Sequence, residues 1–276
     1  MNKIVDIRRI LREKAPGLAG KLPAFIVNYL IKIVHEDEVN HVLDIYRDKD
    51  GIDFMEALIQ YFDIRLNVYG EHRLPASGRY VFVSNHPLGG LDGVCISAVI
   101  GRIYNGRIRV PVNDILLFLP NLRSIFIPVN KHGRQERQTA TITEQAFASD
   151  NHILTFPAGL CSRKIGGTIV DPVWKKSFLQ KAIEHKRDIV PMFFDGRNSN
   201  FFYGLANLRK MLNIKINVEM LYLADELFKS KHSTFGLYFG EPIPWDSFNK
   251  SLSLAEWTEQ IRKKAYSLKN DSYLKN

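Results

Sequence analysis

The chain has 276 residues, of which 38 are Lys or Arg and 29 are Asp or Glu, so its formal net charge is +9. Hydrophobic residues make up 45% and charged residues 24%. These proportions exclude a disordered, collagen-like or disulfide-framework protein and indicate a globular one with a substantial core. The excess of positive charge leaves three classes of partner: a nucleic acid, an anionic membrane surface or an acidic protein.

The two cysteines, Cys95 and Cys161, lack the spacing of a disulfide framework and are predicted to be free thiols in a reducing compartment. A transmembrane helix needs roughly 18 consecutive apolar residues, and the longest apolar runs, 24–31 and 93–101, are about half as long. The N-terminus is charged and has no apolar core of the signal-peptide type. We therefore expect a protein that is neither exported nor membrane-spanning.

The first sixty residues have a helical pattern. Apolar residues recur at steps of three and four within 4–11, 25–33 and 39–46, and Gly51 precedes a fourth run at 54–62. We expect residues 1–62 to form an N-terminal helical region. This region either caps the main domain or lies in a membrane interface.

From residue 63 to 276, strand and helix patterns alternate. Strands are predicted at 65–69, 79–84, 108–112, 125–129, 152–156, 188–194 and 235–240, and helices at 91–100, 135–148, 174–185 and 253–268. The alternation predicts an α/β domain built on a mainly parallel mixed sheet flanked by helices.

The first motif, Asn-His-Pro-Leu-Gly-Gly-Leu-Asp-Gly, occupies residues 85–93, directly after a buried strand. His86 therefore lies at the carboxyl end of that strand, where open α/β sheets bind ligands. A carboxylate beside an imidazole fixes its tautomer and stabilises the imidazolium, so Asp92 is its candidate partner. Six positions separate the two, and Gly89 and Gly90 permit the tight loop that would join them. The alternative is that His86 is a turn residue and Asp92 an N-cap.

The second motif follows the strand that ends at Phe156. A turn containing Gly159 leads to the hydroxyl of Ser162 and the cations Arg163 and Lys164. Exposed backbone N–H groups beside two cations suit a phosphate or another anion. A charged surface turn is the alternative.

In this order the motifs resemble the glycerolipid acyltransferase family, typified by lysophosphatidate acyltransferase. The resemblance covers about residues 63–200 and rests on Asn85, His86 and Asp92, on 123–129, on Phe156, Pro157, Gly159 and Ser162, and on Val190-Pro191. The chain departs from the family pattern at several points. Five residues rather than four separate His86 from Asp92, the 123–129 block lacks its final Arg, and Ala158 and Cys161 replace a Glu and an Arg.

In the family, the missing Arg and Glu positions are associated with a glycerol phosphate acceptor. The pattern is similar to a divergent branch that acylates the hydroxyl of a lyso-ornithine or lyso-glycine lipid, an N-(3-hydroxyacyl) amino acid. The resemblance thus implies an O-acyltransferase of aminolipid biosynthesis, with lysophosphatidate acylation as the alternative.

The resemblance also implies the roles of individual residues. His86 would be the general base and Asp92 its orienter, while the substrate-binding residues would be Asn85, Gly89, Gly90, Gly159, Ser162, Arg163 and Lys164. The Gly89-Gly90 turn or the Gly159 turn would bind the oxyanion. The apolar stretch 115–119 would line an acyl channel or pack in the core.

The implied partners are a lyso-lipid acceptor, an acyl carrier protein or coenzyme A thioester as co-substrate, and an anionic membrane surface, with no bound cofactor. We expect a cytoplasmic enzyme, peripheral on the inner face of the cell membrane. The basic residues that would dock it lie in the N-terminal helices, in 201–215 and in 262–264.

Other functions have weaker support. There is no Gly-x-Ser-x-Gly elbow, and Gly101 and Gly106 are not followed by the Lys and Ser or Thr of a phosphate loop. His35, Glu36 and His41 lack zinc-site spacing, so no metal site is expected. A non-enzymatic basic binding module, built on the aromatic and basic residues of 201–210, is the alternative of another class. No nucleic-acid reader motif occurs, so no nucleic-acid partner is expected.

Overall fold

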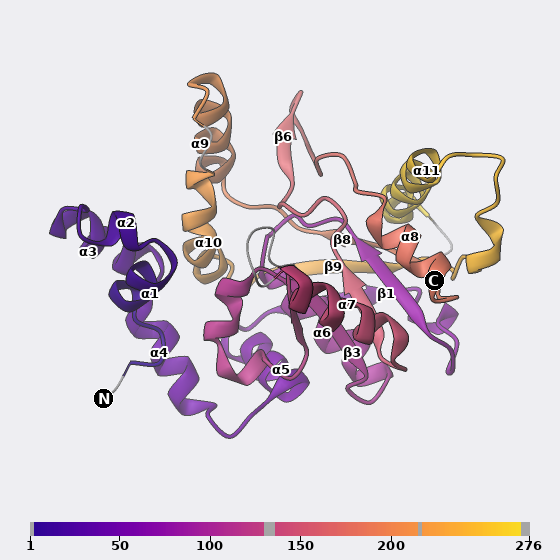
Figure 1. Ribbon diagram of the computed structural model, residues 1–276, viewed down its shortest axis with the longest axis horizontal. Helices are drawn as coiled ribbons and strands as arrows, with labels where there is room; N and C mark the ends of the chain where they lie inside the picture. Colours follow the sequence, from indigo (N-terminus) through magenta and orange to yellow (C-terminus); the bar gives the residue numbers. More distant parts are fainter. Residues whose placement is uncertain (1–2, 130–135, 215–216, 272–276) are drawn as a thin grey trace.

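The computed structural model describes residues 3–129, 136–214 and 217–271 (Figure 1). Its centre is a seven-stranded sheet with the order β1-β9-β8-β2-β5-β3-β4. The strands are β1 (Arg65–Tyr69), β2 (Tyr80–Ser84), β3 (Ile108–Val112), β4 (Phe126–Pro128), β5 (His152–Thr155), β8 (Asp188–Asp195) and β9 (Thr234–Phe239).

Strands β8, β2, β5, β3 and β4 run parallel to one another. Strand β9 is antiparallel to β8, and β1 is parallel to β9. The predicted mixed, mainly parallel sheet is therefore confirmed. The carboxyl ends of the parallel strands meet at one edge of the sheet, where both predicted motifs begin.

Both faces of the sheet are covered, which explains why its strands are apolar throughout. Phe82 and Leu154 face a core formed with α5 (Gly51–Tyr61) and α6 (Leu91–Ile103). Their neighbours Val81 and Ile153 face a second core. Helices α7 (Glu136–Ala148), α8 (Ser177–Glu184) and α11 (Leu254–Ser267) close that second face. Alternate residues of one strand thus serve opposite faces.

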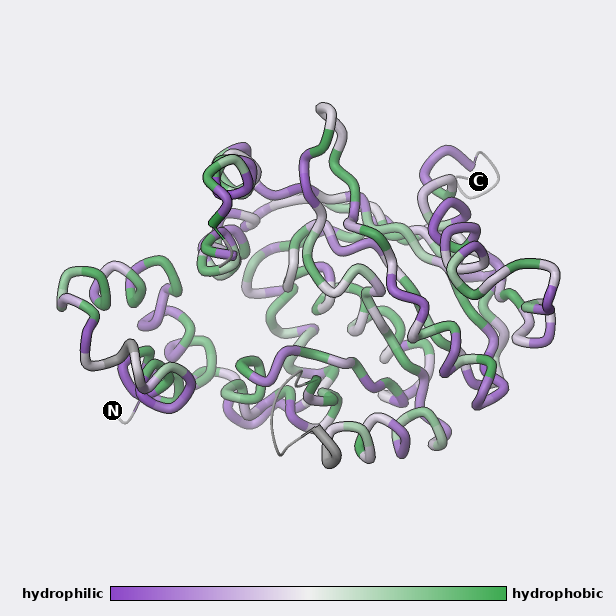
Figure 2. Tube along the Cα trace, turned by 45° about the horizontal axis from the view of Figure 1, so that its top comes forward, coloured by the Kyte–Doolittle hydropathy of each residue, from purple (hydrophilic) through white to green (hydrophobic). Residues whose placement is uncertain are grey.

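The N-terminal helices are α1 (Ile7–Lys14), α2 (Pro16–Ala19), α3 (Ala24–Ile33) and α4 (Glu36–Ile45), followed by α5. Helices α1 to α3 stand to one side of the sheet (Figures 1 and 2). Helix α5 packs differently, because Phe54 and Met55 are buried in the same core as the sheet. The division of the chain near residue 62 stays a prediction. No helix in the described ranges is long and apolar enough to cross a bilayer.

Two features beyond the predicted elements stand out from the carboxyl edge of the sheet (Figure 1). One is a hairpin of β6 (Arg163–Ile165) and β7 (Thr168–Val170). Its turn is Gly166-Gly167, with both φ angles positive, at 56° and 84°, which is the geometry of a tight hairpin turn. The other is α9 (Asn200–Met211), followed by α10 (Leu223–Lys229).

Two predicted segments differ in detail. Helix α8 begins at Ser177 rather than at 174, because Trp174 lies before it and donates its indole N–H to Asp171. The stretch 115–119 is largely a 3-10 turn, Asp114–Phe118. Phe118 and Leu119 pack against the core, whereas Ile115 and Leu116 are exposed. Core packing therefore accounts for only the second half of that stretch.

Candidate active site

The loop after β2 brings His86 and Asp92 together. His86 Nδ1 lies 3.0 Å from Asp92 Oδ2. Asp92 is fully buried in the first turn of α6, whereas 17% of the His86 side chain is exposed. The ring of His86 stacks on Phe156, with the ring centroids 4.0 Å apart. Nε2 makes no hydrogen bond to any described residue, so it is the nitrogen left to accept a proton.

Backbone N–H groups hold Asp92 in this position. Its Oδ2 accepts from the N–H of Leu88 at 2.9 Å, and its Oδ1 accepts from the N–H of Gly93 at 2.9 Å. The loop turns at Gly89, whose φ is +73°. A Cβ there would lie 2.9 Å from the side chain of Leu223 and 3.1 Å from Cys161, so a glycine is required by both conformation and space. This turn closes the five-residue spacer so that His86 and Asp92 meet.

The charges around His86 favour its protonated form. Burial lowers the pKa of His86, but the charge and hydrogen bond of Asp92, together with the charge of Asp171, raise the pKa above its ordinary value. Burial raises the pKa of Asp92, yet His86 and the two backbone N–H groups hold that pKa below its usual range. A buried carboxylate that stays ionised beside an imidazole is the arrangement of a general base and its orienter.

Asn85 joins the end of β2 to β8. Its Nδ2 donates to the carbonyl of Phe194 at 2.9 Å, and its Oδ1 accepts from the N–H of Phe194 at 2.7 Å. The side chain is buried and thus continues the sheet's hydrogen bonding by one step beyond the strand. These two hydrogen bonds fix the backbone directly before His86.

Ser162 and a residue that the sequence did not single out, Asp171, secure the backbone of His86. The N–H of Ser162 donates to the carbonyl of His86 at 2.8 Å, and the N–H of His86 donates to Asp171 Oδ1 at 3.2 Å. The Ser162 hydroxyl also donates to Asp171 Oδ1, at 2.6 Å. Both ends of the β6–β7 hairpin are therefore fastened to the loop that carries His86.

Asp171 is buried, and burial raises its pKa despite hydrogen bonds from Ser162 and Trp174. Its own N–H donates to the hydroxyl of Tyr266 on α11, at 2.8 Å. The only local signal for this residue was the Gly-Gly turn, which predicts a hairpin between 163 and 170 and so places position 171 back at the sheet edge. Tyr266, from the last helix, had no local signal.

Arg163 and Lys164 have different surroundings. The guanidinium of Arg163 donates to the carbonyls of Cys161 and Ser162 and to Glu219 Oε1, the last at 2.9 Å. Glu219 is fully buried and also pairs with Arg209, with Nε and Oε2 2.9 Å apart. Arg163 therefore ties the hairpin to α9. Lys164 has no ion pair with any residue in the described ranges and remains the freer cation.

The backbone N–H groups of the two predicted turns also differ. The N–H of Gly159 donates to the carbonyl of Phe156 at 2.9 Å and so closes its own turn. The N–H groups of Gly89 and Gly90 donate to no other residue that the structure describes. Of the two turns, Gly89-Gly90 has the free donors that an oxyanion needs.

Neither thiol is suited to be a nucleophile. Cys95 and Cys161 are free, as predicted, and both are buried. Burial raises the pKa of Cys161 to about 11, although Arg163 opposes the shift, and burial also raises the pKa of Cys95. Both sulfurs are thus protonated near neutral pH, and a thiol reacts as its thiolate.

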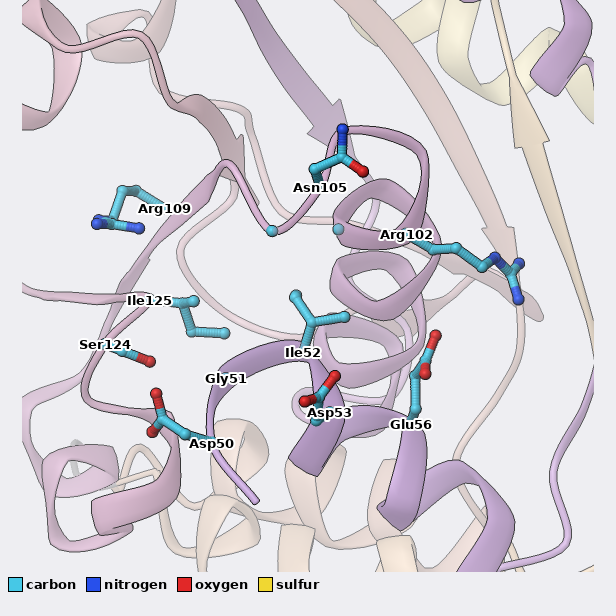
Figure 3. Close-up of a pocket in the computed structure, with 12 residues that line it drawn as sticks. Asp50, Gly51, Ile52, Asp53, Glu56, Arg102, Asn105, Arg109, Ser124 and Ile125 are labelled. Carbon is cyan, nitrogen blue, oxygen red and sulfur yellow. The ribbon is translucent and has the colours of Figure 1, made fainter. Parts of the chain in front are cut away.

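A hollow of about 560 Å³ lies elsewhere, between the start of α5 and the end of α6 (Figure 3). Charged and polar residues line it, among them Asp53, Glu56, Arg102 and Arg109. Arg102 is ten residues along α6 from Asp92, which corresponds to about 15 Å of helix. None of the predicted site residues lines this hollow, and it is separate from the pair of His86 and Asp92.

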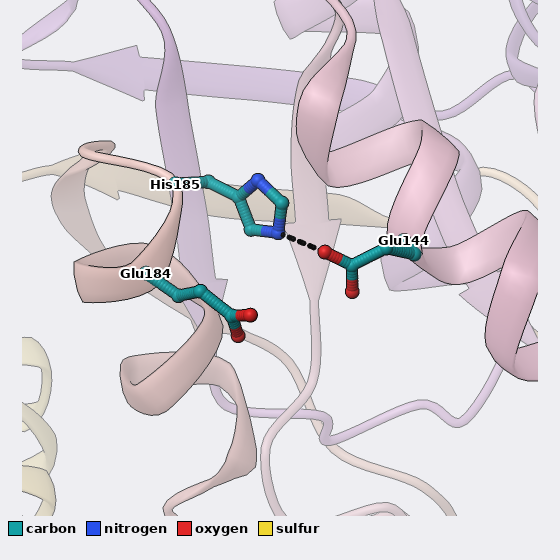
Figure 4. Close-up of side chains that lie close together, drawn as sticks. All are labelled: Glu144, Glu184 and His185. Carbon is teal, nitrogen blue, oxygen red and sulfur yellow. Dashed lines mark ion pairs between the residues drawn. The ribbon is translucent and has the colours of Figure 1, made fainter.

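Among the described residues, one group has the spacing for a metal ion: Glu144, Glu184 and His185 (Figure 4). His185 Nε2 lies 2.8 Å from Glu144 Oε1. The ammonium of Lys181 lies 2.5 Å from Glu144 and 2.8 Å from Glu184. Lys181 therefore already supplies the positive charge that these carboxylates need. The His35 and Glu36 considered in the sequence have separate partners, Asp225 and Lys3.

Comparison with known proteins assigns the chain to a family. A model of the family described as Acyltransferase matches residues 9–274. A lyso-glycine lipid O-acyltransferase of Bacteroides thetaiotaomicron is 49% identical over 265 residues, covering 96% of this chain and 97% of the relative. One from Phocaeicola vulgatus is also 49% identical, covering 96% and 95%.

The crystal structure of the 1-acyl-sn-glycerophosphate acyltransferase PlsC from Thermotoga maritima superposes with a TM-score of 0.49 at 14% identity, over 96% of this chain and 97% of that chain. The family match and the two relatives each span nearly the whole length of the chain. The chain therefore belongs to the acyltransferase family and is an acyltransferase.

Proposed function

We propose that this enzyme moves a fatty acyl group from an acyl thioester to the hydroxyl of a lyso-glycine lipid, an N-(3-hydroxyacyl)glycine. The observation that supports this acceptor is the 49% identity, along almost the full chain, to two lyso-glycine lipid O-acyltransferases. Membership of an enzyme family sets aside the non-enzymatic basic module. The replacements at Ala158 and Cys161 agree with an acceptor that has no phosphate.

His86 is the proposed general base. Its Nε2 takes the proton of the acceptor hydroxyl as the oxygen attacks the thioester carbonyl carbon. Collapse of the tetrahedral intermediate breaks the carbon–sulfur bond, and His86 returns the proton to the leaving thiolate. The thioester is already activated, so no enzyme nucleophile is needed. A positioned base of this kind contributes about 10²–10⁴-fold.

Asp92 serves that base in two ways. Its contact with Nδ1 selects the tautomer in which Nε2 is unprotonated. Its negative charge then stabilises the imidazolium while the proton resides on His86. The free N–H groups of Gly89 and Gly90 are the proposed donors to the oxyanion, because the N–H of Gly159 is already used.

Lys164 is the proposed contact for an anionic group of a substrate. Candidates are the carboxylate of the acceptor and the phosphate of the donor's phosphopantetheine arm, which acyl carrier protein and coenzyme A share. Arg163 is committed to Glu219 and holds the hairpin that carries Lys164. A lipid acceptor also implies work at a membrane surface, and the net charge of +9 suits an anionic one. We propose a peripheral position on the inner face of the cell membrane.

The deciding experiment supplies the purified enzyme with an acyl thioester and one of two acceptors, N-(3-hydroxyacyl)glycine or lysophosphatidate. Transfer is measured by mass spectrometry of the O-acylated product, with His86→Ala as the blank. We expect clear preference for the glycine lipid. Preference for lysophosphatidate would contradict the proposed acceptor but not acyl transfer itself. Running the assay with acyl carrier protein and with coenzyme A thioesters identifies the donor.

A further inference from the structure

Helix α9 presents an apolar stripe to solvent. Phe201, Leu205, Leu208 and Leu212 follow one another at steps of three and four, so they share one face of the helix. Phe201, Leu208 and Leu212 are exposed, as is the adjacent Met211, at 75%. A surface helix normally turns such a stripe inward.

The opposite face of α9 is already packed. Phe202, Tyr203 and Ala206 are buried, the first two in a cluster with Cys161 and, partly buried, Met220. Arg209 continues that side through its ion pair with Glu219. The helix is therefore docked by one face, and the stripe forms a second apolar face. At its start Phe201 contacts Tyr222, with the ring centroids 5.0 Å apart, whereas Leu208, Met211 and Leu212 at its end are exposed.

The stripe lies at the active-site edge. Arg163, at the base of the β6–β7 hairpin, is paired with Glu219, which also holds α9. The same hairpin is fastened to His86 through Ser162 and Asp171. Near its tip, Ile165 is exposed at 56%. The hairpin and α9 thus rise side by side from the edge that carries His86 and Asp92 (Figures 1 and 2). Both have exposed apolar residues.

The exposed charge on these projections is positive. Helix α9 contains Arg209 and Lys210 and no Asp or Glu, and the hairpin adds Lys164. The two acidic residues that contact α9, Glu219 and Glu226, are buried and paired with Arg or Lys. A cationic, apolar surface matches a bilayer that contains anionic lipids. It does not favour a second copy of the chain, because the same cations would then face each other. Tyr29 of α3, hydrogen-bonded to Tyr222 at 2.8 Å, extends the surface with aromatic groups of the kind found at membrane interfaces.

We infer that the exposed stripe of α9 and the tip of the β6–β7 hairpin form a membrane-docking face. This face seats the active-site edge on an anionic bilayer and brings a lipid acceptor to His86. The inference rests on the proposed function, since that function supplies the lipid acceptor. Docking through these residues is nevertheless measurable without any turnover.

The binding test uses sedimentation with vesicles of phosphatidylcholine alone and of phosphatidylcholine mixed with phosphatidylglycerol. We expect the wild type to bind the mixed vesicles more strongly. Leu208→Asn should weaken that binding several-fold, and the triple variant Leu208→Asn, Met211→Asn, Leu212→Asn by about tenfold or more. Ile45→Asn is the matched control, because Ile45 is 46% exposed on α4 and Leu208 is 47% exposed on α9. It should change binding by no more than about twofold.

The activity test separates docking from chemistry. The triple variant should acylate a short-chain acceptor dissolved in water at the wild-type rate and lose about tenfold on a long-chain acceptor held in vesicles. His86→Ala should bind vesicles normally and acylate neither. If the wild type binds through α9 but acylates neither acceptor, the proposed function is overturned and the docking face stands.

Unchanged vesicle binding of the triple variant would overturn the docking face. An equal loss of vesicle binding in Ile45→Asn and in the triple variant would also overturn it. A dimer in light scattering that the triple variant dissociates would assign the stripe to a second copy of the chain instead.

Discussion

Two histidines lie at opposite ends of the neighbouring central strands β2 and β5. Their surroundings shift their pKa values in opposite directions. His86 follows β2 at its carboxyl end, next to the carboxylates of Asp92 and Asp171, which raise its pKa above the ordinary value. His152 opens the neighbouring strand β5 at its amino end. Burial there, with the charges of Arg107 and Arg187, lowers its pKa to about 4.

The difference does not come from burial alone, because both rings are packed among aromatic residues. His86 stacks on Phe156, and His152 lies between Tyr80 and Tyr104. His152 is fully buried and its Nδ1 accepts from the N–H of Tyr80 at 3.3 Å. Arg187 is buried nearby and donates to the carbonyl of Phe147 near the end of α7 and to that of Asn151 in the following turn. A neutral histidine in that position fills the core, whereas a histidine beside carboxylates can exchange a proton.

The largest expected effect is that of His86→Ala. Acyl transfer should fall by about 10²–10⁴-fold, because the base is lost while the fold is kept. Steady-state rates, measured together with a thermal unfolding curve, separate loss of the base from loss of the fold. Substantial transfer by the folded variant would end the proposal that His86 is the base.

Asp92→Asn should come next, with a loss of the order of 10²-fold. An amide of the same shape has one acceptor oxygen, so it can keep the hydrogen bond from the N–H of Leu88 or that from Gly93 but not both. It also carries no charge to stabilise the imidazolium. The pKa of His86 should fall, so the acidic limb of the kcat/KM profile should move to lower pH. A wild-type pH profile in this variant would show that the carboxylate does not act on the base.

Asp171→Asn should have a smaller effect, within about tenfold on kcat/KM. Its charge raises the pKa of His86, so removing the charge leaves the base neutral at lower pH and shifts the acidic limb downward. Ser162→Ala removes a hydrogen bond to Asp171 but not the charge, and it is the control. If both variants lost activity while the acidic limb of the kcat/KM profile stayed at the wild-type pH, the role of Asp171 would be purely structural.

His152→Asn should leave the rate per folded molecule within about twofold of the wild type. Its effect lies in stability. The folded state disfavours protonated His152, and the unfolded chain binds a proton near pH 6.5. The wild-type free energy of unfolding should therefore decrease by up to about 3 kcal/mol as the pH falls from 6.5 to 4. Urea unfolding at several pH values should show that the free energy of unfolding depends less on pH in the variant than in the wild type. An equal pH dependence would contradict the assignment of this effect to His152.

Local patterns were enough to predict most of this fold. The strands and most of the helices follow from hydrophobic periodicity, because strands buried on both faces are apolar and helices repeat at 3.6 residues. Asn85, His86 and the glycines after them marked a loop at the carboxyl edge, since residue type and position relative to a strand are both visible in sequence. The Gly166-Gly167 turn carried a hairpin signal of the same local kind.

Only the tertiary structure decided which groups meet. Asp171 reaches His86 because the hairpin returns to the sheet edge, and Tyr266 joins them from α11, 95 residues further along the chain. The sequence predicted that Arg163 binds an anion. Its pairing with Glu219 instead depends on where α9 and the following turn pack. The pKa values of His86 and His152 shift in opposite directions for the same reason. Electrostatic interactions act through space, and no sequence spacing shows which charges a buried ring will face.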